Sequence, residues 1–105
     1  MLRGDVFRFK PVKGVGHEQH GDRFGVVVQA DELLARSVVI VAPTSRSARA
    51  ASFRPEIEVH GDATRVLVEQ LGAVDTDRLG ELAGHLSREE LWGVDEALMT
   101  VLGLD

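Results

Sequence analysis

The sequence predicts a mainly β domain that ends in one helix, with the strands forming a small antiparallel barrel or a strongly curled sheet. Short runs of β-branched and aromatic residues recur through the first two thirds of the chain. The hydrophobic period then changes to a helical one near the C-terminus. With 105 residues, of which 44% are hydrophobic, the chain can bury one core, so we treat residues 1–105 as a single domain.

Five strands are expected before residue 72. They are residues 5–10 (DVFRFK), 24–29 (FGVVVQ), 37–43 (SVVIVAP), 56–59 (EIEV) and 64–71 (TRVLVEQL). Between the second and third strands, Asp31 is expected to cap a single helical turn. The His60-Gly61-Asp62 sequence predicts a tight turn that joins the fourth strand to the fifth.

The C-terminal segment carries the sequence signals of a helix. Ser87 followed by Glu90 is the pattern of a capping box, and Leu86 and Leu91 can form a hydrophobic staple across it. These signals predict a helix from Arg88 to Leu102 whose apolar face packs on the sheet. The expected apolar stripe consists of Leu91, Val94, Leu98, Val101 and Leu102.

The net charge of −5 conceals a division along the chain. Residues 1–65 hold ten Lys and Arg against eight acids, whereas residues 66–105 hold two against nine. Within 43–54 (PTSRSARAASFR) there are three arginines and no acid, so a local basic site is compatible with the acidic total. Cysteine is absent and no apolar run reaches the length of a membrane span, so we expect a cytoplasmic protein with no membrane contact.

Residues 16–25 (GHEQHGDRFG) carry more polar chemistry than a turn requires. His17 and His20 are three residues apart in a glycine-bounded loop, with no third ligand evident nearby, which disfavours zinc, and we expect no metal or other cofactor. The two long irregular stretches, residues 10–23 and 44–54, are therefore the expected location of function.

Four motifs occur in order: RGDVF at 3–7, GHEQHGDRF at 16–24, VAPTS at 41–45 and VLVEQL at 66–71. Together they resemble the MazF/PemK family of toxin ribonucleases. The resemblance implies an SH3-like antiparallel β-barrel of the MazF/CcdB/Kid type with a C-terminal helix. It also implies a homodimer that cleaves single-stranded RNA at short sequences without a metal, leaves 2′,3′-cyclic phosphate and 5′-hydroxyl ends, and is silenced by a cognate antitoxin.

The resemblance further implies which residues act. Arg23 and Thr44 match the catalytic pair of the family, and His17 matches a position that assists proton transfer in some members. An arginine fork and a hydroxyl suit the charge that develops on phosphorus, although an arginine before a strand is ordinarily only solvated and Thr44 can simply cap a turn. The expected RNA-binding residues are Lys10, Lys13, Glu18, Gln19, Ser45, Arg46, Arg49, Glu69 and Gln70.

Two rival functions stay open at the level of sequence. One is a non-catalytic toxin that binds a protein target, as CcdB-type toxins do, and the other is an inactive homologue that only binds an antitoxin. The chain departs from the family pattern at Phe24, Leu67, Glu69 and Gly72. We expect dimerisation to cover apolar surface that includes an exposed Trp92.

The expected antitoxin is an acidic, extended segment. It would lie across residues 10–23 and 44–54, with any autoregulatory DNA binding made only through the antitoxin. The positive charge there comes from Lys10, Lys13, Arg23, Arg46, Arg49 and Arg54.

Overall fold

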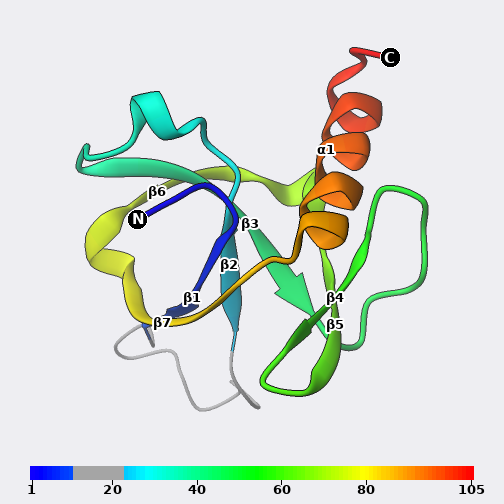
Figure 1. Ribbon diagram of the computed structural model, residues 1–105, viewed down its shortest axis with the longest axis horizontal. Coiled ribbons are helices and arrows are strands. Elements are labelled where there is room, and N and C mark those ends of the chain that lie inside the picture. Colours follow the sequence, from blue (N-terminus) through cyan, green and yellow to red (C-terminus); the bar gives the residue numbers. More distant parts are fainter. Residues whose placement is uncertain (11–22) are drawn as a thin grey trace.

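The computed structural model describes residues 1–10 and 23–105 (Figure 1). In this part of the chain there are seven strands and one α-helix. The strands are β1 (Asp5–Phe9), β2 (Phe24–Val27), β3 (Val38–Ser45), β4 (Glu56–Val59), β5 (Asp62–Val66), β6 (Gly72–Asp75) and β7 (Leu79–His85), and the helix is α1 (Arg88–Leu102). Three single turns of 3-10 helix, η2 (Asp31–Leu33), η3 (Val68–Gln70) and η4 (Thr76–Arg78), connect them.

The strands form one antiparallel sheet in the order β4-β5-β3-β2-β1-β7. The long strand β3 is shared along its length: residues 38–41 pair with β6, and Thr44 and Ser45 pair with β5. The sheet therefore curls around β3, and the β4–β5 hairpin stands apart from the other strands in Figure 1. The expected mainly β antiparallel fold with a C-terminal helix is confirmed.

Both faces of this curled sheet are covered, which explains the consecutive valines of β2. Val26 and Val28 belong to the larger core, which includes buried residues of β4, β5 and α1. Val27 points the other way, into a smaller core with Val39 and Val41. Because successive strand residues face opposite sides, an uninterrupted apolar run is needed where both sides are buried.

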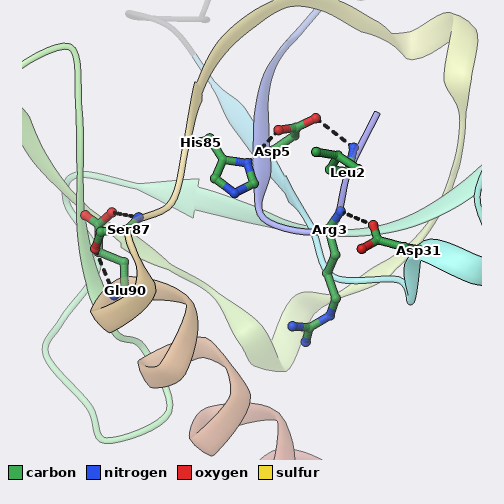
Figure 2. Close-up of polar contacts among 7 residues, drawn as sticks. All are labelled: Leu2, Arg3, Asp5, Asp31, His85, Ser87 and Glu90. Carbon is green, nitrogen blue, oxygen red and sulfur yellow. Dashed lines mark hydrogen bonds and ion pairs between the residues drawn. The ribbon is translucent and has the colours of Figure 1, made fainter.

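The helix α1 has the predicted bounds and the predicted cap. The Ser87 hydroxyl accepts a hydrogen bond from the Glu90 N–H at 3.1 Å, and the Glu90 carboxylate accepts one from the Ser87 N–H at 2.8 Å (Figure 2). Gly103 ends the helix in a left-handed conformation with φ 70°. No helix in the described residues has the length and apolar character needed to cross a membrane.

The prediction that Leu102 belongs to the apolar stripe of α1 is wrong. Leu102 is 53% exposed, while Ala97, which the pattern omits, is buried. The last turn of α1 extends past the strands in Figure 1. Trp92 is 66% exposed, as expected.

Two local predictions between the strands have different outcomes. The turn at residues 60–62 is confirmed: His60 and Gly61 both have positive φ, 52° and 83°, and link β4 directly to β5. The single helical turn at Asp31 also exists, but Asp31 is not its cap. Ala30 holds that position, and the Asp31 carboxylate instead accepts a hydrogen bond from the Arg3 N–H at 2.7 Å (Figure 2).

The fifth strand is shorter than predicted, and two further strands follow it. The prediction of a strand over 64–71 is wrong beyond Val66, where the chain turns into η3. The Leu67 N–H still donates to the Pro43 carbonyl at 2.8 Å, in register with the β3–β5 pairing, and the turn then forms as the Gln70 N–H donates to the Leu67 carbonyl at 2.9 Å. Apolar and polar residues alternate only weakly in the sequences of β6 and β7, so the sequence did not predict these two strands.

Candidate functional site

The pairing of β2 with β3 brings Arg23 and Thr44 to the same end of the sheet. Gly25 lies opposite Pro43 in this antiparallel pair, so the start of β2 and the end of β3 share one edge. Arg23 is exposed and comes immediately before β2, and Thr44 follows Pro43. This edge, made by the start of β2 and the end of β3, is called the β2–β3 edge below.

The same edge includes the end of β1. The Phe9 N–H donates to the Arg23 carbonyl at 2.9 Å, which fixes the backbone of Arg23 and places the exposed Lys10 beside it. A Cβ atom added at Gly25 would lie 2.7 Å from the Phe9 ring. Glycine at this position therefore leaves room for the Phe9 ring to lie against the start of β2 next to Arg23.

Thr44 is a polar residue within the core. It is 2% exposed, pairs with Val66 of β5, and is one of the few buried polar residues in the described chain. Its neighbour Ser45 is partly exposed, with its hydroxyl 3.3 Å from that of Ser47. The pairing fixes the backbone of Thr44 at the end of β3.

Phe24 stands where the family pattern usually has proline, and the structure gives it a packing role. Its ring contacts the larger core, with the Arg8 guanidinium 5.3 Å from its centroid and the His60 ring edge-on at 6.1 Å. Phe24 thus links β1, β2 and the β4–β5 hairpin at the β2–β3 edge.

Arg54 is tied to Glu69, a link that the sequence did not reveal. Its Nε and Nη2 donate to the same carboxylate oxygen of Glu69, at 2.9 and 2.6 Å, and its Nη1 donates to the Arg49 carbonyl at 3.3 Å. Both side chains are 25% exposed. The guanidinium also lies 5.5 Å from the centroid of the Phe53 ring.

These hydrogen bonds from Arg54 lower the pKa of the Glu69 carboxyl, and burial opposes them with a smaller effect. The second carboxylate oxygen, Oε1, is buried and has no hydrogen-bond partner among residues 1–10 and 23–105. Arg54 thus contacts the Glu69 carboxylate through its other oxygen, Oε2. Gln70, next in η3, is exposed.

The remaining expected residues divide into two groups. Arg46 and Arg49 are exposed on the segment that follows β3, with an Arg46 nitrogen 3.5 Å from the Asp62 carboxylate. His17, Lys13, Glu18 and Gln19 lie outside the described residues. Within residues 1–10 and 23–105, no three His, Asp or Glu side chains form a group that could hold a metal ion.

Comparison with known proteins places the chain in a class. A family model described as "PemK-like, MazF-like toxin of type II toxin-antitoxin system" matches residues 2–102. The chain therefore belongs to this PemK/MazF-like toxin family. A Mycobacterium tuberculosis (strain ATCC 25618 / H37Rv) protein named "Putative toxin Rv3098A/RVBD_3098A" is 41% identical over 107 residues, which cover 99% of both chains.

Solved structures share the fold over the whole chain. An endoribonuclease from a mycobacterial species, in complex with its cognate antitoxin, has a TM-score of 0.81 at 20% identity and covers 100% of this chain and 97% of its own. MazF from Deinococcus radiodurans has a TM-score of 0.76 at 22% identity, with 98% and 96% covered. The MazE–MazF complex of that organism gives 0.79 at 21% identity, with 100% and 97% covered.

Proposed function

We propose that this chain is a sequence-specific, metal-independent endoribonuclease that cleaves single-stranded RNA. The observation that carries the proposal is the pairing of Gly25 with Pro43, which sets an exposed Arg23 and a buried Thr44 at one edge of the sheet. The family membership and the endoribonucleases among the structural neighbours support the same reaction.

The reaction uses the 2′-hydroxyl of the substrate as its nucleophile. That oxygen loses its proton and attacks the adjacent phosphorus, the O2′–P bond forms as the P–O5′ bond breaks, and the departing 5′-oxygen takes up a proton, so that one proton passes overall from the 2′-oxygen to the 5′-oxygen. The Arg23 guanidinium stabilises the negative charge on phosphorus, and the Thr44 hydroxyl donates to a non-bridging oxygen. His17, with an imidazole suited to proton transfer near neutral pH, assists in moving the proton.

The proposed RNA path follows the exposed polar residues of the β2–β3 edge. Lys10 and Arg23 lie at its β1–β2 side, and Arg46 and Arg49 lie on the segment after β3. Cations in such a path neutralise phosphates, so binding weakens as salt rises. The other proposed RNA-binding residues are Lys13, Glu18, Gln19, Ser45, Glu69 and Gln70.

The proposed assembly is a homodimer that a cognate antitoxin silences in the cytoplasm. An acidic, extended antitoxin segment would occupy the basic path and compete with RNA, and DNA would be bound only through the antitoxin. Light scattering at micromolar concentration is expected to give a dimer. A monomer with full cleavage activity would exclude the dimer as a requirement.

The ends of the products test the proposed chemistry. We expect a mixed-sequence single-stranded RNA to yield fragments with 2′,3′-cyclic phosphate and 5′-hydroxyl ends, because the nucleophile belongs to the substrate. Fragments with 3′-hydroxyl and 5′-phosphate ends would exclude this route. No cleavage of any sequence, with tight binding to an antitoxin, would favour the non-catalytic binder.

A further inference from the structure

We propose that Arg54 and Glu69 are positioning residues that hold the backbone of Arg49 so that the Arg49 side chain meets the RNA phosphates. This inference rests on the proposed endoribonuclease function. In it, Arg54 does not contact RNA, and Glu69 acts on RNA through Arg54.

The hydrogen bonds of Arg54 occupy its guanidinium within the protein. Each of its three nitrogens donates within the protein: Nε and Nη2 to Glu69, and Nη1 to the Arg49 carbonyl. A guanidinium held in this way has less capacity to bind phosphate. Its bond to a main-chain carbonyl instead restrains the chain that carries Arg49, whose side chain is exposed.

The backbone just before η3, which carries Glu69, is held in place by hydrogen bonds. The Leu67 N–H donates to the Pro43 carbonyl at 2.8 Å, and the Val66 N–H donates to the Pro55 carbonyl at 2.9 Å. These bonds join residues 66 and 67, just before η3, to β3 and to the last residue before β4. The pair Arg54–Glu69 then ties the end of the segment between β3 and β4 to η3, and the Arg54 bond to the Arg49 carbonyl reaches the middle of that segment.

Removal of the Glu69 carboxylate should change RNA affinity in opposite directions under two explanations. A carboxylate near an RNA path repels phosphate, so its removal should strengthen RNA binding if charge alone decides. If Glu69 works by holding Arg54, its removal frees Arg54 and the Arg49 carbonyl, and binding should weaken. The two accounts therefore predict opposite changes for one substitution.

The experiment measures the affinity of the full-length protein for a short 2′-O-methyl RNA of mixed sequence, which cannot be cleaved through its 2′-oxygen. We expect Glu69→Ala to weaken binding by roughly tenfold, the size of one lost charge-assisted contact. Glu69→Gln, whose amide oxygen can still accept from Arg54, should retain most of the affinity. Asp62→Ala removes a nearby exposed carboxylate and serves as the charge control, with no weakening expected.

A double substitution separates positioning from direct contact. Arg49→Ala should lower the slope of log affinity against log salt by about one. Adding Arg54→Ala to it should cause no further loss, because Arg54 acts through Arg49. Thermal unfolding of each variant confirms that the comparison is made between folded proteins.

Two results would overturn the inference while leaving the proposed function intact. One is an RNA affinity of Glu69→Ala that equals or exceeds the affinity of the wild type. The other is a loss of RNA affinity in the double variant that equals the sum of the losses from Arg49→Ala and Arg54→Ala. If the wild type neither binds nor cleaves RNA, the proposed function is wrong and the inference falls with it.

Discussion

Gly25 and Pro43 face each other across the β2–β3 pair, and this register places Arg23 and Thr44 at one edge of the sheet. The two residues are 21 positions apart in the sequence and differ in burial, since Arg23 is exposed and Thr44 is 2% exposed. Sheet pairing, rather than sequence proximity, therefore brings the backbones of these two residues to the same edge of the sheet.

Thr44→Val tests the hydroxyl without changing the shape of the side chain. Because the replacement is nearly isosteric, the core around Thr44 should stay packed, while the donor aimed at the phosphate is lost. We expect kcat for RNA cleavage to fall by about 10²–10³-fold. Thr44→Ser keeps the hydroxyl and should retain much more activity, and equal rates for the Val and Ser variants would contradict the role of the hydroxyl.

Gly25→Ala tests the close approach of the Phe9 ring to Gly25. The new methyl group would meet the Phe9 ring at 2.7 Å, so the free energy of unfolding should fall by about 1–3 kcal/mol in urea denaturation. The control is Gly84→Ala in β7, where an added Cβ meets nothing within 4 Å. A similar loss of unfolding free energy in both variants would indicate that alanine is poorly tolerated at either strand position, whatever the contact with Phe9.

The junction of the N-terminus with β7 predicts a second stability effect. The Asp5 carboxylate is buried and accepts hydrogen bonds from the Leu2 N–H at 2.8 Å and from His85 Nδ1 at 2.7 Å (Figure 2). Asp5→Ala should lower the free energy of unfolding by about 1–3 kcal/mol, because it leaves the Leu2 donor unpaired. His85→Ala, at a half-exposed side chain, should have a smaller effect, and the reverse order would contradict this assignment.

The Glu69 carboxyl should make the free energy of unfolding depend on pH in the acidic range. Arg54 lowers its pKa in the folded protein below the ordinary value of 4.5, so the stabilisation is present above that value. It is lost as the pH falls through the lower, folded pKa. Urea unfolding of the wild type at a series of acidic pH values should therefore show a decline that Glu69→Gln makes shallower, and parallel declines would contradict the assignment.

The sequence was sufficient where a signal is local. Ser87 and Glu90 are three residues apart and define the start of α1, because a capping box is made by one turn of chain. The Arg54–Glu69 link could not be predicted in this way, since it depends on how η3 folds back on the segment after β3. The weakly alternating residues of β6 and β7 are strands because β3 and β1 offer them edges, which is a property of the tertiary fold.

The central claim is that Arg23 drives metal-independent RNA cleavage, and one assay tests it directly. A mixed-sequence single-stranded RNA is incubated in EDTA and low salt with wild type or Arg23→Ala at matched folded concentration. We expect the wild type to cleave in EDTA and the variant to lose about 10²–10³ in rate, because a donor aimed at the developing charge is missing. Equal rates for the two proteins, or wild-type activity that EDTA abolishes, would contradict the account.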